Sequence, residues 1–119
     1  MFESPPYSTY PSGHATESHL VALLLQQLLF DGRGCASQTT AFNDWMKQLE
    51  VMLRRLAMRI ADNRAVAGIH FPFDSEAGEC LAKYLRQVIA ADRLKPSSAN
   101  CNVFHWIWQM AVDEWKPPT

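Results

Sequence analysis

The sequence predicts an all-α fold, a small bundle of about four helices. Apolar residues recur at three- and four-residue steps through most of the chain, and segments containing Gly or Pro separate four such stretches. No stretch has a convincing strand pattern. The chain has 119 residues, the length of one domain, so we expect a single domain over 1–119.

The first predicted helix follows an extended lead-in. Residues 1–11 are rich in Pro, Ser and Tyr and have no helical period. Ser12 is a good N-cap and predicts a helix that runs to about Phe30, where the segment 31–34 with its two glycines should stop it. Because this helix is apolar nearly all round, we expect it to be central and buried.

The second predicted helix has the clearest pattern and runs from about Thr40 to Asp62. Its apolar stripe consists of Phe42, Trp45, Met46, Leu49, Met52, Leu53, Leu56 and Ile60. Charged side chains fall largely on the other face. We therefore expect Trp45 to be a core residue of this helix.

Two further helices complete the prediction. The segment 63–72 contains a glycine and a proline and should interrupt the helical path. A third helix is expected from about 73 to 92, followed by a linker at 95–98. An apolar segment at 103–115 predicts a fourth helix, which belongs to a tail, 93–119, of unclear role.

Composition and charge exclude several classes of protein. With 48% hydrophobic and 19% charged residues, the chain has the composition of a folded, soluble protein. A net charge of −1 argues against charge-driven binding to nucleic acid or to an anionic membrane. No apolar run is long enough to span a membrane, and no secretory signal opens the chain, so the compartment stays undetermined. Three widely spaced cysteines predict free, mostly buried thiols.

The first candidate for chemistry lies at the start of the first helix. A helix N-terminus presents unpaired N–H groups and the positive end of the helix dipole, a natural seat for an oxyanion. Gly13 would let an anion approach the backbone closely, Ser12 can donate its hydroxyl, and His14 could transfer a proton. The plainer interpretation is a capped helix with a surface histidine.

The second candidate is a group of three side chains between the second and third helices. Arg64 is suited to anion oxygens, and His70 lies in a loop beyond it. Asp74 could accept one ring N–H of His70 and leave the other nitrogen free as a nucleophile or ligand. Taken singly, Arg64 could be a solvated helix-end charge and Asp74 an N-cap.

Together these residues resemble a known enzyme superfamily. The motif Pro-Ser-Gly-His at 11–14, followed by Arg64, His70 and Asp74, is similar to the second and third motifs of the vanadium-dependent haloperoxidase / type 2 phosphatidic acid phosphatase superfamily. The resemblance covers roughly residues 5–90. It implies a helical bundle of that family's type.

The resemblance also implies roles for each residue. Three groups would hold the oxygens of phosphate or vanadate: Ser12, the Gly13 backbone and Arg64. His70 would bond to the central atom, as a vanadate ligand or a transient phosphohistidine. His14 would be the acid/base, and Asp74 would orient His70.

Three functions follow as alternatives. The first is a vanadium-dependent haloperoxidase, which oxidises halide with peroxide at a His-bound vanadate. The second is a soluble acid phosphatase that acts on a phosphate ester through a phosphohistidine. The third is a truncated helical module without catalysis.

The chain departs from the family pattern in one respect. The family's first motif, a Lys followed seven residues later by Arg-Pro, has no counterpart here, and residues 1–11 contain no Lys or Arg. We therefore expect an incomplete bundle, either a piece of a longer protein, a chain completed by another chain, or a degenerate member. An incomplete bundle would leave apolar surface exposed, which predicts a missing N-terminal segment or a homo-oligomer.

Overall fold

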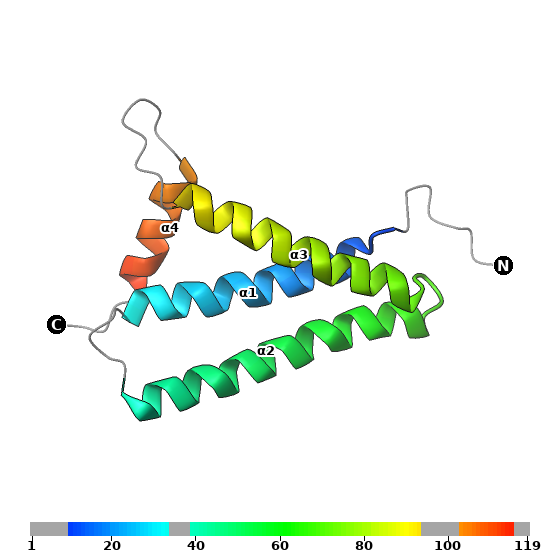
Figure 1. The fold of residues 1–119 in the computed structure, drawn as a ribbon, viewed down its shortest axis with the longest axis horizontal. Coiled ribbons are helices and arrows are strands. Elements are labelled where there is room, and N and C mark those ends of the chain that lie inside the picture. The colour runs from blue at the N-terminus through cyan, green and yellow to red at the C-terminus, as the bar shows by residue number, and fades with distance from the viewer. Residues whose placement is uncertain (1–9, 34–38, 94–102, 116–119) are drawn as a thin grey trace.

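The computed structural model describes residues 10–33, 39–93 and 103–115 (Figure 1). Within these ranges the chain is all-α, as predicted, and contains no strand. The four helices are α1 (Gly13–Arg33), α2 (Thr40–Val66), α3 (Pro72–Arg93) and α4 (Val103–Glu114). The lead-in over residues 1–9 and the linker at 95–98 lie outside the described residues.

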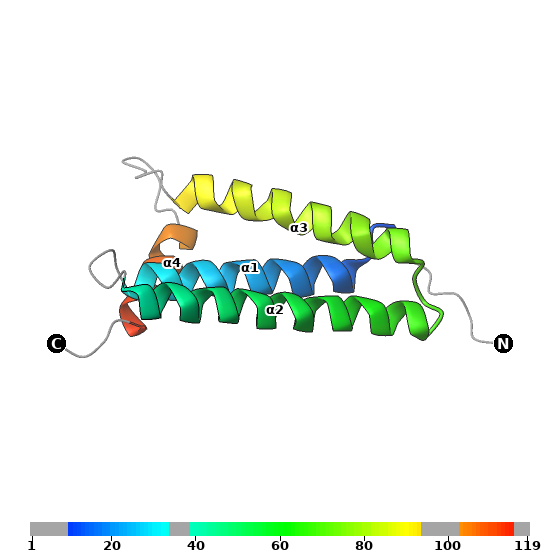
Figure 2. The ribbon, with the colours of Figure 1, turned by 60° about the horizontal axis from the view of Figure 1, so that its bottom comes forward.

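Helix α1 is the centre of the arrangement. It packs against both α2 and α3, whereas α2 and α3 touch each other little. In both views α1 lies between its two neighbours, with α2 running antiparallel to it and α3 parallel to it (Figure 1, Figure 2). Helix α4 packs across the C-terminal end of α1. The molecule measures 58 × 41 × 20 Å, so in its shortest dimension it is only about two helix diameters thick.

Two helices are longer than the sequence predicts. Helix α1 continues through 31–33, where a stop was expected, and there Gly32 lies against the C-terminal end of α4: a Cβ added to it would be 3.0 Å from Trp115 Cβ and 3.4 Å from the Val112 carbonyl oxygen. Gly32 therefore lies within the helix, at a close contact between helices, and does not end the helix. Helix α2 ends at Val66 rather than near Asp62, and the turn after it uses Gly68 at φ 71°. Arg64 therefore belongs to the last turn of α2.

A close contact between helices joins α1 and α3 at Gly78. A Cβ added to Gly78 would lie 2.8 Å from the carbonyl oxygen of Ser12 and 2.9 Å from Ala15 Cβ. The other buried positions in this region are also small: Ala57 and Ala61 on α2, and Ala82 on α3. Small side chains allow the backbones to approach closely, so this end of the bundle is held by short contacts rather than by large apolar groups.

The expectation that α1 is buried all round is wrong. One face is buried, through Ser12, Ala15, Thr16 and His19. The opposite face is open to solvent, and Val21 is 54% exposed. The physical reason is the thin arrangement, because α2 and α3 cover only part of α1 and α4 covers only its C-terminal end.

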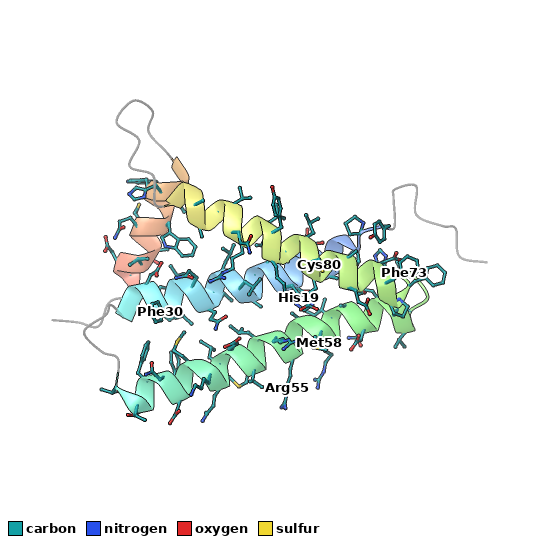
Figure 3. All side chains as sticks on the ribbon, viewed as in Figure 1. His19, Phe30, Arg55, Met58, Phe73 and Cys80 are labelled. Carbon is teal, nitrogen blue, oxygen red and sulfur yellow. The ribbon has the colours of Figure 1, made fainter. Side chains whose placement is uncertain are left out.

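Two other burial predictions also fail. Trp45, expected in the core, is 41% exposed at the outer side of α2, although its ring stacks on buried Phe42 with centroids 6.0 Å apart. Cys80 is a free thiol, as expected, but it is exposed on α3 (Figure 3). Cys35 and Cys101 lie outside the described residues. None of the helices described combines the length and apolar character needed to cross a membrane.

Candidate functional site

The Ser12–His14 segment and the segment with Arg64, His70 and Asp74 meet at one end of the helical bundle. The N-terminus of α1 lies beside the turn that joins α2 to α3, and the Ser12 N–H donates a 2.9 Å hydrogen bond to the Asp74 carbonyl oxygen. The rings of His14 and His70 have centroids 6.5 Å apart. Residues far apart in the sequence thus surround one small region, as expected for a shared site.

Ser12 starts α1 as its N-cap. Its Oγ accepts a hydrogen bond from the Ala15 N–H at 3.3 Å, and its carbonyl oxygen accepts one from the Thr16 hydroxyl at 2.9 Å. The residue is completely buried, so its hydroxyl lies inside the α1–α3 contact. Gly13 differs, because it is exposed and a Cβ placed on it would meet nothing within 4 Å. The open space needed for an anion therefore lies over the Gly13 backbone.

Asp74 closes the first turn of α3. Its Oδ2 accepts the Phe71 N–H at 2.8 Å, and its own N–H donates to the Phe71 carbonyl oxygen at 3.0 Å. The residue is 1% exposed. The same Oδ2 lies 3.7 Å from His70 Nδ1, which is within ion-pair range but longer than a hydrogen bond. The Asp74 carboxylate thus lies on the Nδ1 side of the His70 imidazole, opposite Nε2.

His70 is held by the backbone of α2. The N–H groups of Ile69 and His70 both point to the Arg64 carbonyl oxygen, at 3.1 and 3.4 Å. The His70 side chain is only 9% exposed, and its Nδ1 has no hydrogen-bond partner. Since Nδ1 faces Asp74, Nε2 is the ring nitrogen that remains for a ligand.

Unpartnered polar atoms gather at this end of the molecule. Among the described residues, four buried side-chain polar atoms lack a hydrogen-bond partner, and three belong to this site: Arg64 Nε, His70 Nδ1 and Ser75 Oγ. The fourth is Arg86 Nε, farther along α3. Such groups are rare in folded proteins and are often satisfied by a ligand or ion. Sequence reasoning did not find Ser75, because a lone serine in a first turn is an ordinary residue there.

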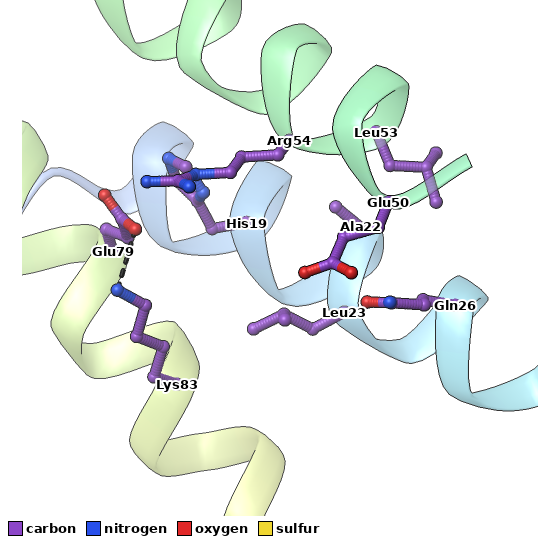
Figure 4. A pocket seen from close by; sticks show the side chains of 9 residues that line it. All are labelled: His19, Ala22, Leu23, Gln26, Glu50, Leu53, Arg54, Glu79 and Lys83. Atoms are coloured by element: carbon purple, nitrogen blue, oxygen red, sulfur yellow. Dashed lines mark ion pairs between the residues drawn. The ribbon is translucent and has the colours of Figure 1, made fainter. Parts of the chain in front are cut away.

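Away from this site, a cavity with polar and apolar lining lies between α1, α2 and α3. It has a volume of about 200 Å³. Its polar lining consists of His19, Gln26, Glu50, Arg54, Glu79 and Lys83 (Figure 4). His19 is buried, and Glu79 forms a 2.8 Å ion pair with Lys83. The position of His19 seven residues after Ser12, on the same helical face, is the signal in the sequence that it points inward.

The electrostatics of this cavity act on His19 and Glu79. Burial lowers the pKa of His19 below its usual 6.5; the nearby Glu79 carboxylate opposes this, and Lys83 and Arg54 add to it. The hydrogen bond from Lys83 lowers the pKa of Glu79 below its usual 4.5, although burial works against it. At neutral pH the cavity therefore holds a neutral histidine beside an ionised carboxylate.

The lowered pKa of His19 predicts a pH dependence of stability. Above pH 6.5 the histidine is neutral in both states; as the pH falls below 6.5, the unfolded chain binds the proton first, so the free energy of unfolding decreases. Glu79 adds a loss only below 4.5. Urea unfolding at about pH 7, 6 and 5 should show wild-type stability falling and a His19→Gln variant changing less. Equal slopes for both proteins would contradict this assignment, and His105→Gln serves as an exposed control.

Among the described residues, no three His, Cys, Asp or Glu side chains converge as a site for a metal ion. No protein-family model, curated protein or solved structure matches this chain. A function must therefore be argued from the residues and their geometry.

Proposed function

We propose that this chain binds a tetrahedral oxyanion between the N-terminus of α1 and the α2–α3 turn, and that it acts as a vanadium-dependent haloperoxidase. The supporting observation is the approach of the two motifs, with the His14 and His70 ring centroids 6.5 Å apart, together with the open space over Gly13 and the buried, unpartnered atoms on Arg64 and Ser75. A bound anion would accept hydrogen bonds that the Arg64 and Ser75 donors otherwise lack, and His70 would face it with Nε2.

The charge distribution supports an anion rather than a cation. The first turn of α1 contains no acidic residue, so no carboxylate in that turn opposes the positive end of its dipole. Arg64 makes no ion pair among the described residues, which leaves its charge for a ligand. Asp74 is the nearby carboxylate, and it lies behind His70, where it can orient the imidazole.

The residues fit vanadate as they fit phosphate, because both are tetrahedral oxyanions. Vanadate, when bound, supplies the activation of peroxide that halide oxidation needs. His70 would hold the anion through Nε2, Arg64 and the Gly13 N–H would bind its oxygens, and His14 would donate or accept a proton at an oxygen of the anion. Asp74 would keep the His70 proton on Nδ1.

A phosphatase reaction is the second candidate, and the position of Asp74 favours it. A carboxylate behind Nδ1 makes Nε2 more basic and more nucleophilic. His70 Nε2 would attack phosphorus, the ester oxygen would leave with a proton from His14, and water would then hydrolyse the phosphohistidine to phosphate and free histidine. Both candidates use the same anion seat.

Two assays and one binding measurement test the proposal. The chain is assayed with vanadate, peroxide and bromide, and separately with a phosphate monoester; thermal unfolding is followed with added vanadate or phosphate. We expect the unfolding temperature to rise with ligand concentration, since a ligand of the native state stabilises by RT ln(1 + [L]/Kd). No stabilisation by either anion and no turnover would leave the non-catalytic helical module as the function.

The charge of Arg64 predicts a second result. In Arg64→Gln the affinity for phosphate or vanadate should fall by about 2 kcal/mol, roughly thirtyfold, because one charged hydrogen-bond partner is lost. Arg55→Gln is the matched control, since this side chain on the same helix is exposed and points away from α1 (Figure 3). The affinity is measured from the ligand dependence of thermal unfolding. Equal losses in both variants would assign the effect to overall charge rather than to the site.

A further inference from the structure

A large apolar face remains uncovered on the open side of α1 and α2. It consists of five side chains, Val21 and Leu25 on α1 and Met52, Leu56 and Ile60 on α2, here called the α1–α2 face. Their exposed fractions are 54%, 39%, 62%, 56% and 38%. A groove of about 320 Å³ runs along this face, and most of its lining is apolar.

The area of this face is that of an interface. The five side chains leave on the order of 500 Å² of apolar surface in water, more than scattered surface residues account for. A stable protein–protein contact covers about 800 Å² on each partner, with a polar rim around an apolar centre. The α1–α2 face is large enough to form the apolar centre of such a contact.

The rim carries opposite charges on its two sides. Glu17 lies on α1 and Arg59 on α2, and both side chains are exposed without an ion pair among the described residues. Helical spacing places Glu17 at the outer edge of the face on α1, and Arg59 at the outer edge on α2. The hydrogen bond from the Ser18 hydroxyl to the Ala57 carbonyl oxygen, 3.4 Å, shows that the two charges lie at nearly the same height along the helices.

We propose that the α1–α2 face binds the same face of a second copy of this chain. A two-fold axis parallel to α1 and α2 would place α1 of each copy against α2 of the other. Because α1 and α2 are antiparallel, every pair of neighbouring helices in the resulting four-helix arrangement would also be antiparallel. This axis keeps the height of every residue, so Glu17 meets Arg59 of the partner subunit, twice in each dimer. The five apolar side chains form the centre.

The same contact borders the candidate oxyanion site. His14 lies at the end of the groove, together with Glu17. A second copy seated on the face would therefore shield one side of His14 from water. The dimer itself does not depend on the chemistry proposed for that site.

Sedimentation velocity and light scattering of the full chain test the apolar centre. The wild-type protein should be a dimer, and Val21→Asp and Leu56→Asp should each convert it to a monomer at the same concentration. Val88→Asp on α3, 43% exposed in the wild type, is the matched control and should remain dimeric. Because all three positions are exposed, helicity by circular dichroism should stay unchanged. A monomeric wild type, or a dimer that survives both face variants, overturns the proposal.

Charge exchange tests the two-fold pairing. Glu17→Arg and Arg59→Glu should each weaken the dimer about tenfold, since each places two like-charged pairs across the interface. The double variant restores opposite charges and should regain the wild-type dissociation constant. The control double variant combines Glu17→Arg with Arg54→Glu, which lies on the cavity side of α2, and it should not regain the wild-type dissociation constant. Failure of the double variant to recover, or recovery with Arg54→Glu as well, overturns the pairing.

Discussion

Replacing Gly78 with alanine is expected to lower the free energy of unfolding by about 2 kcal/mol. In an ordinary helix interior this change raises stability by about 1 kcal/mol, because alanine has the better helix propensity. Here the new Cβ would lie 2.8 Å from the Ser12 carbonyl oxygen and 3.1 Å from the Thr16 nitrogen. Both atoms belong to the backbone, so α1 and α3 must move apart.

The matched control is Gly13→Ala, where a Cβ meets nothing within 4 Å. Chemical unfolding in urea should show a lower free energy of unfolding for Gly78→Ala and no decrease for Gly13→Ala. The Ser12 N–H to Asp74 bond depends on the same contact, so Gly78→Ala should also weaken phosphate or vanadate binding. A Gly78→Ala protein as stable as Gly13→Ala would show that the α1–α3 contact is looser than described.

His70→Ala is expected to remove turnover in whichever reaction the chain catalyses, by at least about a thousandfold. The physical reason is that Nε2 is the atom proposed to bond to the central atom of the anion, and neighbouring residues cannot replace it at that position. His14, the nearest other imidazole, has its ring centroid 6.5 Å away. The rate constant kcat is measured with bromide and peroxide, and with a phosphate monoester.

Added imidazole distinguishes a chemical role of His70 from a structural one. The deletion leaves a space beside Asp74 that free imidazole can enter, so partial recovery of activity is expected, while circular dichroism shows that the helices of the variant are retained before imidazole is added. His105→Ala, on exposed α4, is the control and should keep full activity. Retained activity in His70→Ala would end the assignment of this residue as nucleophile or ligand.

Much of the local structure could be predicted from the sequence. Ser12 and Thr39 are short polar residues before apolar periodic stretches, and each is an N-cap whose oxygen accepts an N–H three residues on. The period of 3.6 residues identifies the helices because it depends on neighbours along the chain. The helix ends were harder to predict, since Gly32 is kept in α1 by packing from α4.

The residues of the candidate site are a prediction from the sequence, and their arrangement could not be predicted from it. Arg64, His70 and Asp74 were found from their type and spacing, as were Ser12, Gly13 and His14. The complete burial of Ser12 and the unpartnered Ser75 hydroxyl could not be foreseen, because both depend on how closely α3 approaches α1. The inward position of His19 beside Glu79 likewise depends on three helices meeting.

The sequence by itself determined the four helices and the apolar stripes of α2 and α3. Only the tertiary structure decided which stripes are covered, which helix ends meet and where the cavities lie. The physical reason is that periodicity and capping are local properties of the chain, whereas burial depends on which surface approaches another. Leu25 and Leu56 are as apolar as any core residue, yet the packing of α2 and α3 around one side of α1 leaves both in water.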